Sequence, residues 1–387
     1  WKSSLAVDAQ LPWGIVGTLE GIYNKDLTIA LGRNPNLVAP QPLNTSGYPD
    51  NRNIYPNAVR DKFLYSLTSA NLPVTTGTAS GANAFNPVVL YNRHKGYYWS
   101  ASAKLDKRFS NGLFASVAYV RSNAKALFDG SGDQLLNTWS LTQIVNDGNN
   151  PELSYANYVV PSRLIASLSY RKEYFGHLGT TISVFYEGSA QGRFSYVYGG
   201  DFNRDGQTND LIYVPKDASE IDFTSFNYGT SAAPNNVSAE RQKELFFQYI
   251  EQDDYLKTRK GQYAERNGAK TPWRNQFDLK LVQDVFTNIG GKRNTLQFSL
   301  DVFNLGNFLN KDWGLVQSIN NNSILVPTNT TAPSNNPNLP LYTPGGTVRP
   351  TFRLATDRGN PITSTFRNTN ALASTYFMQF GLRYIFN

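Results

Sequence analysis

The residues with the clearest capacity for chemistry form a short run of oxygen-bearing side chains. The run reads Asp201-x-Asn203-x-Asp205-Gly206-x-x-Asn209-Asp210. Oxygen ligands at alternate positions, followed by a glycine at a sharp turn, suit Ca²⁺, which takes about six to eight oxygens in proteins. An EF-hand would place its bidentate glutamate at the position of Ile212, so the run is not an EF-hand, although Asp210 could serve instead. Two interpretations remain open: a Ca²⁺ site formed by Asp201, Asn203, Asp205, Asn209 and Asp210, or an Asx-rich turn in a solvated loop.

Residues suited to catalysis are sparse. The chain has no cysteine, and its two histidines, His94 and His177, fall near a strand end and in a tight turn. No recognisable motif brings a serine, a histidine and an aspartate together. Three acids, Glu187, Asp278 and Asp301, fall on polar strand faces, where such groups more often tune a polar interior than transfer protons. We therefore expect that the protein is not an enzyme.

The composition is unusual for a soluble domain. Only 17% of the 387 residues are charged, whereas 13% are aromatic, and average soluble domains have about 25% charged residues. The mean hydropathy of −0.42 is too polar for a helical membrane protein, and no apolar run approaches the ~20 residues of a spanning helix. A transmembrane β-barrel has this composition, because its strands alternate apolar and polar side chains and its aromatics gather at the membrane interfaces.

The net charge of +7 could suggest nucleic acid as a partner. Lysine and arginine are scattered through loops and strand ends, however, and no basic face is indicated. We expect no nucleic-acid binding.

Strict alternation is the main structural signal. In the clearest segment the apolar positions are Leu296, Phe298, Leu300 and Val302, and the positions between them are polar. A period of two is typical of a β-strand with two different environments. Nine such strands are predicted, at about 2–10, 14–30, 95–108, 112–126, 160–175, 180–195, 274–286, 294–308 and 374–386.

Short and long connections alternate along the chain. Four tight turns are rich in Gly, Pro and Asn, and the other connections are long and polar, at about 31–94, 127–159, 196–273 and 309–373. The longest loops argue against a soluble β-sandwich or propeller, because compact domains usually connect elements with about 4–6 residues. Short periplasmic turns and long extracellular loops are typical of outer-membrane barrels. The sequence thus predicts an all-β, antiparallel transmembrane β-barrel in the outer membrane of a Gram-negative bacterium, with the C-terminus in the periplasm.

The closing half of the chain resembles a known family. The segments that carry the resemblance are Gly200–Pro215, Tyr249–Asp253, Gly261–Asn267, Pro272–Asp278, Asp301–Leu305 and Gly381–Phe386. Together, in this order, they resemble the TonB-dependent outer-membrane transporters, and more closely their Oar-like (SusC-related) members. One departure is Asn387, since the family usually ends in an aromatic residue and here Phe386 is the penultimate one.

The resemblance implies a 22-stranded barrel of which residues 1–387 would form the nine C-terminal strands. Its plug, its N-terminal regulatory-like domain and its remaining strands would then precede Trp1. The implied function is TonB-dependent, energised uptake of a large substrate, with membrane lipid, the plug and the TonB system as partners. The alternative is a structural, adhesion or assembly barrel whose loops dock partner proteins. Outside the sheet, residues 238–255 have helical spacing of Phe246, Phe247 and Ile250, which predicts a helix packed on its own loop or a lid over a substrate.

Overall fold

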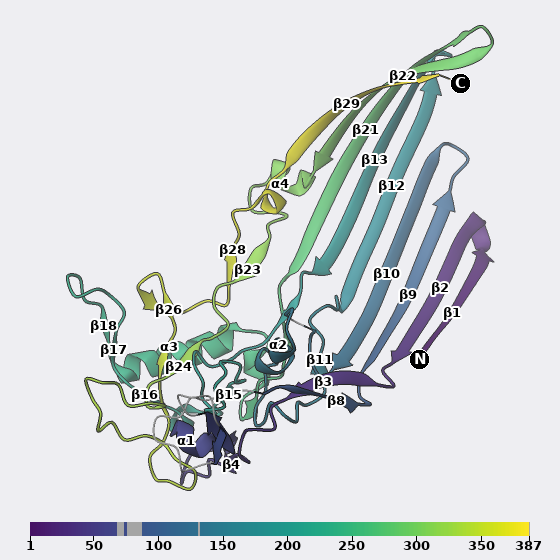
Figure 1. Cartoon of the computed structure of the whole chain (residues 1–387). Helices are drawn as coiled ribbons and strands as arrows, with labels where there is room; N and C mark the ends of the chain where they lie inside the picture. Colours follow the sequence, from purple (N-terminus) through teal and green to yellow (C-terminus); the bar gives the residue numbers. More distant parts are fainter. Residues whose placement is uncertain (68–72, 76–86, 131, 387) are drawn as a thin grey trace.

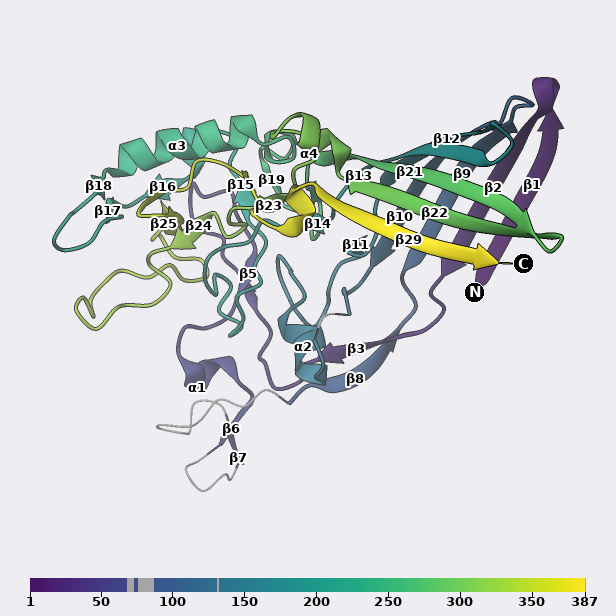
Figure 2. The ribbon, with the colours of Figure 1, turned by 90° about the horizontal axis from the view of Figure 1, so that it is seen from above.

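Nine long strands dominate the computed structural model, which describes residues 1–67, 73–75, 87–130 and 132–386. They form one antiparallel sheet in which neighbours in sequence are neighbours in space, with the two-residue strand β11 (Ser154–Tyr155) added beside β10. In sheet order the strands are β1 (Lys2–Leu11), β2 (Ile15–Lys25), β9 (Tyr97–Arg108), β10 (Leu113–Ala126), β12 (Ser162–Tyr174), β13 (Leu178–Ala190), β21 (Trp273–Ile289), β22 (Lys292–Phe303) and β29 (Phe377–Phe386). The sheet is curved, and β1 and β29 are its two edges (Figure 2).

The nine predicted strands are confirmed, but three of them end earlier than expected. The strand predicted at 14–30 ends at Lys25, and the strand predicted at 180–195 ends at Ala190. The strand predicted at 294–308 ends at Phe303, because Asn304 adopts a left-handed conformation (φ 53°) and begins the short helix α4 (Leu305–Leu309).

The tight turns all lie at one end of the sheet, and the long connections lie at the other (Figure 1). The turn between β9 and β10 shows why it contains glycine. Gly112 has φ +89°, and a Cβ there would lie 2.2 Å from the carbonyl oxygen of Arg171 on β12. Only glycine allows that strand to approach so closely.

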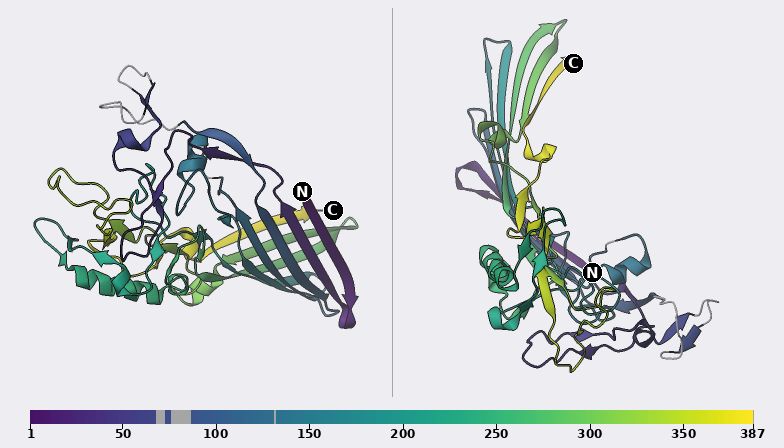
Figure 3. Two further views of the ribbon diagram at one scale, coloured as in Figure 1. Left: turned by 90° about the horizontal axis from the view of Figure 1, so that it is seen from below. Right: turned by 90° about the vertical axis from the view of Figure 1, so that its left-hand side faces the viewer.

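The long connections, residues 26–96, 127–161, 191–272 and 304–376 as far as they are described, pack together into what we call the loop body (Figures 1 and 3). Its helices are α1 (Val59–Lys62), α2 (Leu135–Ser140), α3 (Ala239–Gln252) and α4, with 3-10 turns η2 (Ala218–Glu220), η3 (Leu256–Thr258) and η4 (Leu372–Ser374). Its paired short strands are β3 (Ile29–Arg33) with β8 (Val89–Arg93), β4 (Gln41–Pro42) with β5 (Asn53–Ile54), β6 (Tyr65–Leu67) with β7 (Pro73–Thr75), β14 (Arg193–Phe194) with β20 (Ala269–Lys270), β15 (Tyr213–Val214) with β19 (Gln262–Tyr263), β17 (Phe226–Asn227) with β18 (Asn236–Val237), β23 (Gln317–Ile319) with β28 (Phe366–Asn368), β26 (Thr356–Asp357) with β27 (Asn360–Pro361), and β16 (Asp222–Phe223) with β25 (Thr351–Leu354) and β24 (Leu325–Pro327).

The predicted helix is present as α3. Ser238 is its N-cap and accepts a hydrogen bond from the backbone N–H of Arg241 at 3.2 Å. Phe246 and Ile250 are fully buried in the core of the loop body, and Phe247 packs at its edge. The helix thus packs on β16 and η3 of its own connection and also on β25 of the fourth connection.

The apolar core lies in the loop body and not against the sheet. Among the described residues, every buried apolar side chain belongs to a long connection except Ala124 and Val302. The largest cluster includes Tyr196, Tyr198 and Phe352. Within the part of the chain that the structure describes, no apolar layer covers the sheet, whereas the sheets of soluble domains pack against one.

No helix in the described part of the chain has both the length and the hydropathy needed to cross a bilayer.

Candidate functional site

Two regions carry functional potential: the faces of the sheet and a junction in the loop body. The pairing register places the apolar positions of all nine strands on one face. Leu300, for example, is paired with Leu281 on one side and Phe380 on the other, and Leu19 is paired with Val7. Large side chains remain open on this face, with Leu5 74% exposed and Phe298 47% exposed. A continuous apolar surface of this kind marks an interaction with another molecule or with lipid.

The other face of the sheet carries polar and charged side chains in pairs. Lys280 donates to Asp301 at 2.7 Å, and Arg171 donates to Asp284 at 2.8 Å. Gln297 also donates to Asp284, at 2.8 Å. Of the three strand acids that the sequence analysis considered for catalysis, two form ion pairs on this face. Glu187 pairs with Arg163 at 2.8 Å, and Asp301 pairs with Lys280. The third, Asp278, accepts hydrogen bonds from Gln276 and from the backbone N–H of Asn304.

The acidic run forms a compact loop, residues 201–210, which we call the acidic loop. The Asp201 carboxylate accepts from the Gly206 N–H, and Asn203 Oδ1 accepts from the Asp205 N–H, both at 2.8 Å. Asp205 in turn accepts from the Gln207 N–H at 2.8 Å. Gly206 has φ +93°, which favours glycine at this turn. The bonds of Asn203 and Asp205 are Asx turns, in which a side-chain oxygen accepts from the backbone N–H two residues later.

The acidic loop is the junction at which the other three long connections meet. From the first connection, the Tyr55 N–H donates to the Asn203 carbonyl at 2.7 Å. In the second connection (127–161), the carbonyls of Ser140 and Thr142 accept hydrogen bonds from Asn209 Nδ2 at 3.0 and 2.8 Å. In the fourth connection (304–376), the Tyr342 carbonyl accepts a hydrogen bond from Arg204 at 2.7 Å. The acidic loop is therefore hydrogen-bonded directly to each of the other three long connections.

The run does form Asx turns, but it is not the solvated loop that the second interpretation expected, because Asp205 and Asp210 are buried. Asp205 is 1% exposed and Asp210 is fully buried. Burial, together with the charge of Asp201, raises the pKa of Asp205 to about 7. Burial and the Asp205 charge also raise the pKa of Asp210 far above its usual range, although Arg52 opposes the shift. A nearby positive charge would therefore favour the ionised form of each carboxylate.

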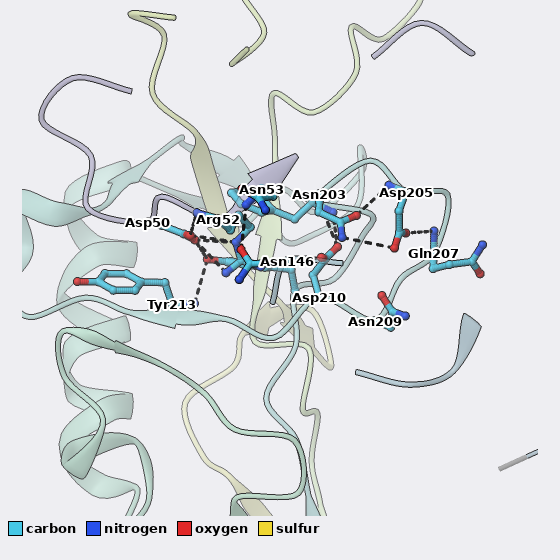
Figure 4. A network of polar contacts seen from close by, with 12 residues as sticks. Asp50, Arg52, Asn53, Asn146, Asn203, Asp205, Gln207, Asn209, Asp210 and Tyr213 are labelled. Atoms are coloured by element: carbon cyan, nitrogen blue, oxygen red, sulfur yellow. Dashed lines mark hydrogen bonds and ion pairs between the residues drawn. The ribbon is translucent and has the colours of Figure 1, made fainter. Parts of the chain in front are cut away.

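A buried arginine supplies part of that positive charge. Arg52 binds Asp50 at 2.9 Å, and its Nη1 lies 3.9 Å from Asp210 Oδ1 (Figure 4). Its guanidinium also lies over the rings of Tyr198 and Phe202, at 4.9 and 4.8 Å from their centroids. Although burial acts to lower the pKa of Arg52, the charges of Asp50 and Asp210 raise it above its ordinary value.

Sequence reasoning missed these cations. Within the run it pointed only to Arg204, which turns away to bind the carbonyls of Tyr342 and Thr330. Arg52 and Lys62 come from the first connection, about 150 residues earlier in the sequence, and no local signal linked them to the acids. Lys62 is 9% exposed, and its charge opposes the burial that raises the pKa of Asp201.

The remaining candidates lie apart from the junction. His94 contacts Leu27 and Thr28 near the loop-body end of the sheet, and His177 lies in the tight turn between β12 and β13. In the part of the chain that the structure describes, no group of three or more His, Cys, Asp or Glu side chains is gathered so that it could hold a metal by itself. Any cation in the acidic loop must therefore also use amide or backbone oxygens.

Comparisons with models of protein families, with curated proteins and with solved structures found no match for this chain.

Proposed function

We propose that the sheet is part of a transmembrane β-barrel in the outer membrane of a Gram-negative bacterium, and that this barrel imports a large substrate with energy from the TonB system. The observation that carries the proposal is the apolar face of the sheet, which no element among the described residues covers. Leu19 is 62% exposed in the middle of β2, and Phe298 is 47% exposed in the middle of β22. Such a surface is unfavourable in water and favourable in hydrocarbon.

The two edges of the sheet support closure into a barrel. In the described residues β1 pairs only with β2, and β29 pairs only with β22. In hydrocarbon, each unpaired backbone N–H or C=O would cost several kcal/mol, so both edges require further strands. The resemblance to the Oar-like transporters suggests that 22 strands complete the circuit.

The two ends of the sheet give the proposed barrel its direction. Short turns are typical of the periplasmic end and long loops of the extracellular end. The loop body would then lie outside the cell, and Phe386, at the turn end of β29 (Figure 1), would lie at the periplasm. The polar face, with pairs such as Lys280 and Asp301, would line the lumen and contact the plug.

The transport role is tested by comparing substrate uptake in three strains: the parent, a strain that lacks this protein and a strain that lacks TonB. A panel of peptides, oligosaccharides and metal chelates too large for porins would be supplied. We expect at least one compound whose uptake is lost in both mutant strains and restored by the intact gene. If uptake of every compound depends on TonB but never on this protein, the transport proposal fails. The placement of the sheet in the membrane is tested by separate experiments.

A second candidate function is docking of partner proteins by the loop body. The loop body has its own apolar core, including Tyr196, Phe246 and Phe352, and is therefore a preformed surface of the kind that binding partners use. Under this function the strain that lacks the protein would take up the whole panel normally. The barrel purified from the parent strain would carry bound partner proteins.

A further inference from the structure

We propose that the acidic loop binds one Ca²⁺ ion, and that this ion fixes the junction of the four long connections. The proposal concerns the loop body alone and does not depend on transport or on the membrane.

Side-chain oxygens without a hydrogen-bond partner carry the proposal. Three such oxygens are enclosed in the acidic loop: Asp201 Oδ1, Asn209 Oδ1 and Asp210 Oδ1. Asn209 is 4% exposed and Asp210 is 0% exposed, so water does not freely solvate them. In Figure 4 the side-chain oxygen of Asn209 faces the carboxylates of Asp205 and Asp210. Buried polar atoms normally have partners, so several unpartnered oxygens in one place point to a bound cation.

The other oxygen of each side chain is already engaged. Asp201 Oδ2 accepts from the Gly206 N–H, and Asp210 Oδ2 accepts from the backbone N–H groups of Phe202 and Asn203, at 2.8 and 3.2 Å. Asn209 uses its Nδ2 for the carbonyls of the second connection. The free oxygens are thus held in place before any ion arrives, which lowers the cost of ordering the ligands on binding.

The charge balance favours a divalent cation. When they are ionised, the carboxylates of Asp201, Asp205 and Asp210 outnumber the cations that face them, because Arg204 turns away to the carbonyls of Tyr342 and Thr330 and leaves Arg52 and Lys62. The Arg52 Nη1 atom lies 3.9 Å from Asp210 Oδ1, which is a long distance for an ion pair. Within the described residues, neither Arg52, Lys62 nor Arg204 forms an ion pair with Asp201 or Asp205. Ca²⁺ fits better than Mg²⁺ because it accepts a flexible arrangement of carboxylate and amide oxygens, whereas Mg²⁺ demands near-ideal octahedral geometry, and better than Zn²⁺ because residues 201–210 include no histidine or cysteine.

The proposal is tested by titrating the purified, folded protein with Ca²⁺ after chelator treatment, with heat of binding and limited proteolysis as two readouts. We expect one site that prefers Ca²⁺ to Mg²⁺, and slower proteolysis of the long connections in Ca²⁺. Asp205→Asn keeps the shape of the side chain and relieves repulsion, so it should fold without the ion but bind Ca²⁺ at least about tenfold more weakly. Asp254→Asn is the matched control, because the Asp254 side chain is 96% exposed in the same connection and, among the described residues, forms an ion pair with Lys257 alone.

A second variant tests the ligand assignment from the opposite direction. Asn203→Asp adds a carboxylate at the third position of the loop, and it should tighten Ca²⁺ binding about tenfold. The proposal is overturned if wild-type protein shows neither heat nor protection up to about 10 mM Ca²⁺, a concentration above the range of weak extracellular Ca²⁺ modules. It is also overturned if Asp205→Asn binds Ca²⁺ as tightly as the Asp254→Asn control, or if Asn203→Asp leaves the affinity unchanged.

Discussion

Replacing Leu300 with arginine tests whether the apolar face lies in lipid. Leu300 is near the middle of β22 and is flanked by Leu281 and Phe380, neither of which can accept a hydrogen bond from a guanidinium. Phe298 would be a poorer choice, because its partner Gln283 could bind the new arginine. At the bilayer midplane an outward-facing arginine costs about 2–4 kcal/mol. The folded-to-unfolded ratio should thus fall by roughly 30- to 900-fold.

The assay is reversible urea unfolding of the folded protein in lipid vesicles, and Gln297→Arg is the matched control. Gln297 is on the polar face of the same strand and donates to Asp284 at 2.8 Å, a bond that an arginine can also make, so its cost should stay below about 1 kcal/mol. Equal costs for the two variants would refute the assignment of the faces. A cost below about 0.5 kcal/mol for Leu300→Arg would mean that the position faces water.

Three further predictions concern the loop body and the turns. Arg52→Met leaves the buried Asp50 and Asp210 without their cation, so it should destabilise the loop body by about 3–5 kcal/mol. The loss should be seen as faster hydrogen exchange at the junction, and unchanged exchange would disprove the role of Arg52. Ser238→Ala removes the N-cap hydrogen bond of α3 and should lower the stability of the helix by about 1 kcal/mol, measured by local hydrogen exchange. The control Ser231→Ala, in an exposed turn, should leave the stability unchanged. Gly112→Ala forces a Cβ against the Arg171 carbonyl at 2.2 Å and should cost about 1–3 kcal/mol in urea unfolding. A cost equal to that of Ser110→Ala, at an exposed position in the same turn, would contradict the close approach.

The sheet could be predicted from the sequence because its signal is local. Alternation in segments such as Leu296–Val302 fixes both the strand and its face, and tight turns fix the order of neighbours. The ends of the strands were less certain, since they depend on single residues. Asn304 in a left-handed conformation ends β22 early, and nothing in the periodicity of the strand foretold this.

The junction in the loop body could be predicted only in part. The spacing of Asp201, Asn203 and Asp205 revealed oxygen-bearing side chains on one loop, and the structure does bring them together. Their burial and the approach of Arg52 and Lys62 depend on contacts between connections that are far apart in sequence. No pattern within either connection indicates such a contact, because each side chain also suits a solvated surface.

The most direct measurement of the central claim is the labelling of single cysteines from outside the cell. These 387 residues contain no cysteine, so Ser231→Cys in the loop body and Asn111→Cys in a tight turn each provide one exposed thiol. A maleimide that does not cross membranes should label the Ser231→Cys protein on intact cells, and it should label the Asn111→Cys protein only after the outer membrane is permeabilised. Labelling of both positions on intact cells, or of the turn alone, would contradict the proposed barrel and its direction.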